Sequence, residues 1–257
     1  MEKRFKSHKK WILLCAVWFL AMHTVRPAEI RVSAAASLKN ALNEVAEVYQ
    51  GRSGHRLILN FDSSGTLARQ IQEGAPVDVF VSADAAKMDF LSEKNLILRS
   101  TRRDILGNQL AIVVAGDCAA VIQTPADLAA SGIRKVAVGQ PQAVPAGIYA
   151  RAYLEGLGLW DRVSKKILPC ENVRSVLAAV EAGHADAGIV YVTDALISKK
   201  VRTAVVVGVE QGPRIVYPAA VTKASGCRRE AEDFVGFLQG ADARRIFRKF
   251  GFAVLSD

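Results

Sequence analysis

The amino-acid sequence predicts an α/β protein folded into two lobes, and three observations support this class. Short apolar strands alternate with amphipathic helices at close spacing, which is typical of sheets flanked by helices. The alternation is interrupted by a long apolar strand at residues 109–115 and then begins again. A further apolar strand at residues 214–221 precedes two helical segments, and we expect it to return the chain to the first lobe.

These patterns place lobe 1 in residues 29–108 and 216–257 and lobe 2 in residues 109–215, with chain crossings near residues 107–112 and 205–218. We expect each lobe to contain an open parallel sheet with helices on both faces. In such sheets, ligands bind beyond the carboxyl ends of the strands, where the helices begin.

The first lobe opens with a short strand that leads through Ser37 into an amphipathic helix at residues 38–50. The apolar positions of this helix form one stripe, made of Leu38, Ala41, Leu42, Val45, Val48 and Tyr49. Ser37 stands between the extended run and the first helical turn, so it is predicted to be the N-cap. The elements that follow are a strand at 57–61, a helix at 66–71, a strand at 77–81, and a helix through Met88 and Leu91.

The second lobe continues the alternation. After the strand at 109–115, further strands are predicted at 136–139 and 187–192, with helices at 146–154 and 173–180. Asn172 is placed to cap the second of these helices. The returning strand at 214–221 is followed by two helices whose apolar positions are Ala231, Phe234, Val235 and Leu238 in the first, and Ala243, Ile246, Phe247 and Phe250 in the second.

Residues 1–28 read as a signal peptide. A basic head precedes twelve apolar residues at positions 11–22, whereas a membrane-spanning helix needs about 20. The cleavage site stays open, because cutting after Ala28 leaves Arg26 where a small residue is expected. An uncleaved anchor is the alternative. Either way the sequence predicts export, and a periplasmic location for the mature chain.

Charge and cysteine content exclude several classes of protein. The formal charge of +9 falls to +4 without residues 1–28, which leaves 28 basic and 24 acidic residues. No basic run interleaved with aromatics remains, so nucleic acid is not an expected partner. Cys118, Cys170 and Cys227 are an odd number, so at most one disulfide forms, and the sequence leaves open whether two of them pair.

The sequence carries no signature of an enzyme or a cofactor site. It has neither a Gly-x-Ser-x-Gly nucleophile elbow nor a Gly-x-x-x-x-Gly-Lys-Ser/Thr phosphate loop. Beyond the leader, the histidines are His55 and His184, each in a polar turn near glycine. We therefore expect no catalytic residues, no cofactor and no protein ligands to a metal ion.

Strand-to-helix turns with small or hydroxyl residues are the recurring feature. There are four of them: Ala36-Ser37, Ser63-Ser64-Gly65-Thr66, Pro145-Ala146-Gly147 and Asn172-Val173. A helix start offers unpaired N–H groups and the positive end of the helix dipole, which together suit an anion. Ordinary capping explains each turn equally well when it is taken alone.

Ordered motifs along the chain resemble the periplasmic molybdate-binding proteins of ABC transporters. They are Ala34–Leu38, Phe61–Ile71, Gly74–Asp84, Val138–Ala150, Glu171–Arg174, Gly188–Tyr191, Tyr217-Pro218 and Phe247-x-x-Phe250-Gly251-Phe252. The resemblance implies a two-lobed periplasmic-binding-protein fold of type II, with the ligand in the cleft between the lobes. It further implies a monomer that delivers molybdate or tungstate to a membrane permease.

The same resemblance implies the ligand set Ser37, Ser64, Ala146, Val173 and Tyr191. Molybdenum would be held as the whole oxyanion, with no direct bond from the protein to the metal. No arginine or lysine is among these residues, so neutral donors and helix dipoles would hold the dianion. A pocket of donors rejects anions that keep a proton, whereas sulfate would be rejected only by size.

Some alternatives remain open at this point. Asp62 forms an Asx turn, a second cap or an ion pair with Arg69, or else faces the cleft and alters the ligand preference. The same fold would serve a binding protein for sulfate or a small organic anion, a secreted enzyme, or a sensor domain. The sequence does not separate molybdate from tungstate.

Overall fold

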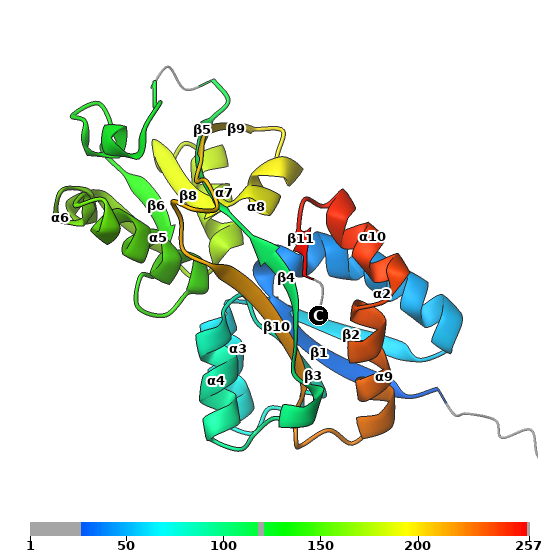
Figure 1. Ribbon diagram of the computed structural model, residues 1–257. Coiled ribbons are helices and arrows are strands. Elements are labelled where there is room, and N and C mark those ends of the chain that lie inside the picture. Colours follow the sequence, from blue (N-terminus) through cyan, green and yellow to red (C-terminus); the bar gives the residue numbers. More distant parts are fainter. Residues whose placement is uncertain (1–26, 118–120, 256–257) are drawn as a thin grey trace, which may run out of the picture.

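The computed structural model describes residues 27–117 and 121–255, so nearly all of the predicted signal peptide lies outside the described residues. The chain forms two sheets, each with helices packed on it, as the fold class predicted (Figure 1). We call the six-stranded sheet and its helices lobe 1, and the five-stranded sheet and its helices lobe 2. No helix within the described ranges is both long and apolar enough to cross a membrane.

The sheet of lobe 1 has the strand order β11-β4-β10-β3-β1-β2. Its strands are β1 (Glu29–Ala35), β2 (Arg56–Asp62), β3 (Val79–Val81), β4 (Arg103–Asn108), β10 (Ile215–Val221) and β11 (Ala253–Val254). Strands β1, β2 and β3 run parallel, whereas β10 runs antiparallel to β3 and β4. The expected all-parallel sheet is therefore wrong, because β10 and β4 carry the chain between the lobes and cross the sheet in opposite directions.

Helices cover both faces of this sheet. On one face lie α2 (Lys39–Ser53), α9 (Arg228–Leu238) and α10 (Ala241–Lys249), and on the other α3 (Ser64–Gln72) and α4 (Ala85–Glu93) (Figure 1). Strand β3 is apolar throughout because both of its faces are buried. Val79 and Val81 pack into one core, and Phe80 packs into the other with Leu67 and Met88. The predicted apolar stripe of α9 is buried, at Ala231, Phe234, Val235 and Leu238.

Lobe 2 is built on the strand order β7-β6-β8-β5-β9. Its strands are β5 (Leu110–Ala115), β6 (Val136–Gly139), β7 (Ile167–Cys170), β8 (Ala187–Tyr191) and β9 (Val201–Val206). Its helices are α5 (Pro145–Gly156), α6 (Trp160–Val163), α7 (Val173–Glu181) and α8 (Val192–Ile197). Strands β6, β7 and β8 are parallel, and β5 runs antiparallel to β8 and β9, so this sheet is mixed as well.

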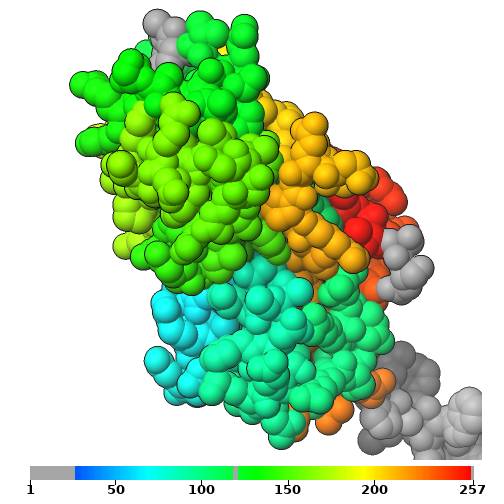
Figure 2. Space-filling view, turned by 60° about the vertical axis from the view of Figure 1, so that its left-hand side comes forward, coloured from blue at the N-terminus to red at the C-terminus, as the bar shows by residue number. Residues whose placement is uncertain are grey.

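The chain passes between the sheets twice, from β4 to β5 through Gln109 and from β9 to β10 through residues 207–214. The two lobes meet in a continuous surface on the face shown in Figure 2. Gly65 of lobe 1 lies so close to lobe 2 that a Cβ atom added there would lie 2.4 Å from the carbonyl oxygen of Ala143. The lobes are therefore in a closed arrangement.

Local differences from the sequence prediction have identifiable causes. Four strands were missed, β4, β7, β9 and β11; β4 begins with the exposed pair Arg103-Asp104 and becomes apolar only at Ile105. Helix α3 begins at Ser64, two residues earlier than predicted, because Ser63 is its N-cap. Four short 3-10 helices complete the fold: η1 (Ala36–Leu38), η2 (Arg99–Thr101), η3 (Pro125–Ala129) and η4 (Ser164–Lys166).

Candidate functional site

A small cavity lies between the lobes, at the carboxyl ends of β1, β2, β6 and β8. All five residues that the resemblance implied as ligands line it: Ser37, Ser64, Ala146, Val173 and Tyr191. The other lining residues are Ala35, Ala36, Asp62, Ser63, Ala83, Val144, Pro145 and Asn172. The lining contains no lysine or arginine, so any anion here would be held by neutral groups.

The start of α3 supplies the first group of donors. The Ser63 side chain accepts a hydrogen bond from the Thr66 N–H at 3.2 Å, which satisfies one of the unpaired groups of the first turn. The buried Ser64 hydroxyl oxygen accepts from the Ala83 N–H at 2.9 Å. Because a serine hydroxyl also carries one hydrogen, the Ser64 O–H stays available to donate into the cavity.

Ser37 lies inside η1 and not at its start. Ala35 is the N-cap of η1 and Leu38 is the N-cap of α2, and neither cap uses a side chain. The prediction that Ser37 caps a helix is therefore wrong. Its hydroxyl instead contacts the Tyr217 hydroxyl at 3.1 Å, across 180 positions of sequence. A distant tyrosine fixes this serine, so local sequence could not reveal its role.

The start of α5 presents backbone and no side-chain donors. Pro145 occupies the first helical position, where the lack of an N–H costs nothing, and Ala146 follows. Gly147 lets this turn approach β6 closely: a Cβ at Gly147 would lie 1.9 Å from the carbonyl oxygen of Gly139. Two glycines thus hold the helix start against the strand end, with the Ala146 N–H free of helical partners.

The start of α7 leaves one backbone N–H group available to donate to the cavity. The Asn172 side chain accepts from the N–H groups of Arg174 at 3.0 Å and Ser175 at 3.1 Å, as predicted for a capping residue. Val173 precedes these two, and a first-turn N–H has no carbonyl partner in its own helix. Its N–H is therefore the donor that this helix start offers to the cavity.

Tyr191 ends β8 and provides a buried hydroxyl group. The residue is 1% exposed, and its hydroxyl oxygen has no hydrogen-bond partner among the described residues. Burial, together with the nearby Tyr217 hydroxyl, raises the pKa of Tyr191 well above its usual value, so the group stays protonated at neutral pH. A buried hydroxyl without a partner is costly and points to a ligand that accepts its hydrogen.

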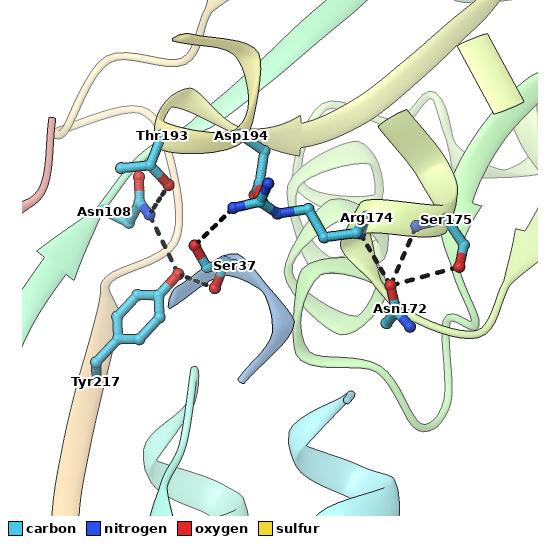
Figure 3. A network of polar contacts seen from close by, with 8 residues as sticks. All are labelled: Ser37, Asn108, Asn172, Arg174, Ser175, Thr193, Asp194 and Tyr217. Atoms are coloured by element: carbon cyan, nitrogen blue, oxygen red, sulfur yellow. Dashed lines mark hydrogen bonds and ion pairs between the residues drawn. The ribbon is translucent and has the colours of Figure 1, made fainter. Parts of the chain in front are cut away.

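A charged pair that the sequence did not point to, Arg174 and Asp194, contacts the site through Ser37 (Figure 3). The Arg174 guanidinium donates to the Ser37 carbonyl oxygen at 3.1 Å, which joins lobe 2 to lobe 1. Its Nε lies 2.7 Å from Oδ1 of the fully buried Asp194. Burial raises the pKa of Asp194 to about 6, although Arg174 acts in the opposite direction.

Asp62 lines the cavity, and its Oδ1 accepts from the Ser63 N–H at 2.7 Å. The same oxygen accepts from Asn172 Nδ2 of the other lobe at 3.4 Å. The ion pairs found between described residues do not include one with Arg69. Asp62 therefore bridges the lobes at the edge of the cavity, with its Oδ1 already bound by two donors.

The remaining sequence candidates lie away from the cavity. His55 accepts from the Ala28 N–H at 3.2 Å, and His184 is exposed in a turn. Cys170 and Cys227 are free thiols, and Cys118 lies outside the described residues. Within residues 27–117 and 121–255, no cluster of three or more His, Cys, Asp or Glu side chains is placed to hold a metal ion.

Comparisons with known proteins identify the family of this chain. The family model of the bacterial extracellular solute-binding proteins matches residues 30–253. The molybdate-binding protein ModA of Escherichia coli is 38% identical over 256 residues, which cover 96% of this chain and 99% of the relative. The ModA of Haemophilus influenzae is 36% identical over 233 residues, which cover 88% and 90%.

Solved structures match over the same extent. The periplasmic molybdate-binding protein of Azotobacter vinelandii is similar with a TM-score of 0.79 at 25% identity, covering 88% of this chain and all of that one. The sulfate-binding protein SubI of Mycobacterium tuberculosis has a TM-score of 0.78 at 19% identity, covering 88% and 86%, and shares the fold. The chain belongs to the bacterial extracellular solute-binding proteins and, among them, to the ModA family of molybdate-binding proteins.

Proposed function

We propose that this chain captures molybdate or tungstate as the intact tetrahedral dianion and delivers it to an ABC transporter. The observation that carries the proposal is the buried Tyr191 hydroxyl, which has no hydrogen-bond partner in the described part of the chain and belongs to a cavity lined by helix starts from both lobes. The similarity to proteins named molybdate-binding supports the choice of anion.

The proposed contacts are divided between the lobes. Ser37 and Ser64 donate through hydroxyl and backbone groups, Ala146 and Val173 donate through backbone N–H groups, and Tyr191 donates through its hydroxyl. Each hydrogen bond to a charged group contributes roughly 1.5–3 kcal/mol, so several together offset the desolvation of a dianion. Molybdenum is cargo in this scheme, and no protein atom bonds to the metal.

Donors from both lobes meet on one anion, so binding stabilises the closed arrangement by differential affinity for the two states. We propose the sequence boundaries of lobe 1 (29–108 and 216–257) and lobe 2 (109–215) as the moving parts. The closed surface at which the two lobes meet would then be the feature that a membrane permease recognises. We further propose that the protein is exported by residues 1–28, acts as a periplasmic monomer and catalyses no reaction.

Titration of the purified chain with molybdate, tungstate, sulfate and phosphate tests the proposal, with melting temperature and calorimetry as readouts. A ligand present at 100 times its dissociation constant stabilises the folded state by about 2.7 kcal/mol. We expect this gain with molybdate or tungstate. A stabilisation by sulfate or by an organic anion, with none from molybdate or tungstate, would contradict the proposal.

A further inference from the structure

A series of hydrogen bonds runs from Asn108, where the polypeptide first passes between the lobes, to the candidate site (Figure 3). Asn108, the last residue of β4, donates through Nδ2 to the Thr193 hydroxyl at 2.9 Å and to the Tyr217 hydroxyl at 3.1 Å. The Tyr217 hydroxyl in turn lies 3.1 Å from the Ser37 hydroxyl. Asn108 and Tyr217 do not line the cavity, whereas Ser37 does.

The direction of these hydrogen bonds is set at Asn108. Its Oδ1 accepts from the Gln109 N–H at 2.9 Å, so the amide oxygen must face that backbone group. The amide nitrogen therefore faces Thr193 and Tyr217, and each of its two hydrogens has one acceptor. A rotated amide would place the Nδ2 donor against the Gln109 N–H donor, which excludes the reverse orientation.

Tyr217 transmits this direction to the site. The side chain is fully buried, and its oxygen accepts from Asn108, so its own hydrogen needs another acceptor. Ser37 Oγ is the other group that the structure places within hydrogen-bond distance of this hydroxyl. Tyr217 thus donates to Ser37, and the hydrogen of the Ser37 hydroxyl is left to point into the cavity.

We propose that Tyr217, oriented by Asn108, directs the hydrogen of the Ser37 hydroxyl toward the bound oxyanion and so contributes to selectivity against oxyanions that carry a proton. This inference rests on the proposed function, since it concerns the same cavity. A serine free to rotate can donate to a dianion or accept from the hydroxyl of hydrogen phosphate. A serine that already accepts from Tyr217 has one lone pair occupied and its hydrogen directed into the cavity, so it favours an acceptor oxygen on the ligand over a protonated one.

The first test is Tyr217→Phe, which keeps the ring and removes the hydroxyl. Molybdate and hydrogen phosphate are titrated at neutral pH by calorimetry, and the ratio of their affinities is the readout. We expect the molybdate-to-phosphate ratio to fall about tenfold, the size of one neutral hydrogen bond. The control is Tyr49→Phe, which removes a hydroxyl that donates to the Glu230 carbonyl oxygen far from the cavity.

The second test is Asn108→Asp, which should reverse the direction of the hydrogen bonds that join Asn108, Tyr217 and Ser37. Two carboxylate oxygens would accept from Gln109 and Tyr217, so Tyr217 would accept from Ser37 and turn its hydrogen away from the ligand. The variant also adds a negative charge, and a double-mutant cycle with Tyr217→Phe separates the two effects. We expect Asn108→Asp to weaken molybdate binding at least tenfold more in the wild-type background than in the Tyr217→Phe background.

The outcomes separate this inference from the proposed function. An unchanged affinity ratio in Tyr217→Phe, additive effects in the cycle, or a wild-type protein that binds hydrogen phosphate within tenfold of molybdate would each overturn the inference. A wild-type protein that binds sulfate and neither molybdate nor tungstate would overturn the proposed function. The sulfate-to-phosphate ratio of the same variants would then decide the role of Tyr217.

Discussion

The two lobes approach the same cavity with different chemistry. Lobe 1 presents serine hydroxyls, Ser37 and Ser64, each held by a second contact from another part of the lobe. Lobe 2 presents the helix starts at Ala146 and Val173, whose side chains carry no polar atom, and adds a single hydroxyl from Tyr191. The hydroxyl donors of lobe 1 depend on the identity of the side chains, whereas the helix-start donors of lobe 2 depend on the position of the backbone.

This difference determines which substitutions matter. In lobe 1, removing a hydroxyl removes a donor while the backbone stays in place. In lobe 2, the proposed backbone donors at Ala146 and Val173 survive a change of side chain, but they depend on the capping by Asn172 and on the close approach of Gly147 to Gly139.

The largest effect is expected from Gly147→Ala, which should disrupt the part of the site that lobe 2 contributes. The new Cβ would lie 1.9 Å from a backbone oxygen, so the start of α5 must move away from β6. We expect a loss of about 3 kcal/mol in the free energy of unfolding, the upper part of the overpacking range. Molybdate affinity should fall about 10- to 100-fold, because the hydrogen bond from the Ala146 N–H to the charged ligand is displaced.

The matched control is Gly156→Ala at the other end of α5, where an added Cβ meets nothing within 4 Å. It should leave affinity unchanged and stabilise the chain by about 0.4–1 kcal/mol through the unfolded state. Equal effects of the two substitutions in denaturant melts would show that the approach to Gly139 is not the constraint.

Arg174→Met should have the next largest effect, mainly on the free energy of unfolding. It leaves the Asp194 carboxylate buried without its partner, which costs about 3 kcal/mol when one member of a buried pair is removed. Chemical denaturation measures this. The control is Arg151→Met, whose exposed pair with Glu155 should contribute less than about 1 kcal/mol. A loss at Arg174 no larger than that at Arg151 would contradict the structural role given to the pair.

Ser37→Ala and Ser64→Ala should each weaken molybdate binding about 10- to 100-fold without unfolding the protein, because each removes one hydrogen bond to a charged ligand. Calorimetry on the folded variants measures the change. Val173→Ala is the lobe 2 counterpart, and it should keep affinity within about threefold because its N–H remains. If the serine variants bind as tightly as the wild type while Val173→Ala does not, the contrast between the lobes is wrong.

The smallest effect concerns pH and Asp194. Its pKa is raised from 3.8 to about 6 in the folded chain, so the folded state binds a proton more tightly than the unfolded state between these values. This group alone therefore makes the free energy of unfolding higher at pH 5 than at pH 7, by about 1 kcal/mol. Denaturant melts of the wild type and Asp194→Asn at both pH values should show this difference in the wild type only. The reverse sign would mean that Arg174 outweighs burial.

Much of the local structure could be predicted from the sequence. The cap at Asn172 and the strand–helix alternation follow from short-range patterns, which depend on backbone geometry and hydrogen bonds between near neighbours. Strand β4 was missed because its first residues are charged and exposed, and only pairing with β10 makes it a strand. The cap assigned to Ser37 failed because a contact with Tyr217 decides where its hydroxyl points.

The chemistry of this protein follows directly from its residues: small and hydroxyl residues at strand-to-helix turns, no basic residue among them, and glycines where the backbone must approach closely. Tertiary structure decided which of these turns meet and in which direction their hydroxyls point. Ser37 contacts Tyr217 across 180 positions and Arg174 across 137, and those contacts exist only because β10 returns to the first sheet and the lobes close. Capping and strand formation are local, whereas the convergence of donors on one cavity depends on how distant strands pair.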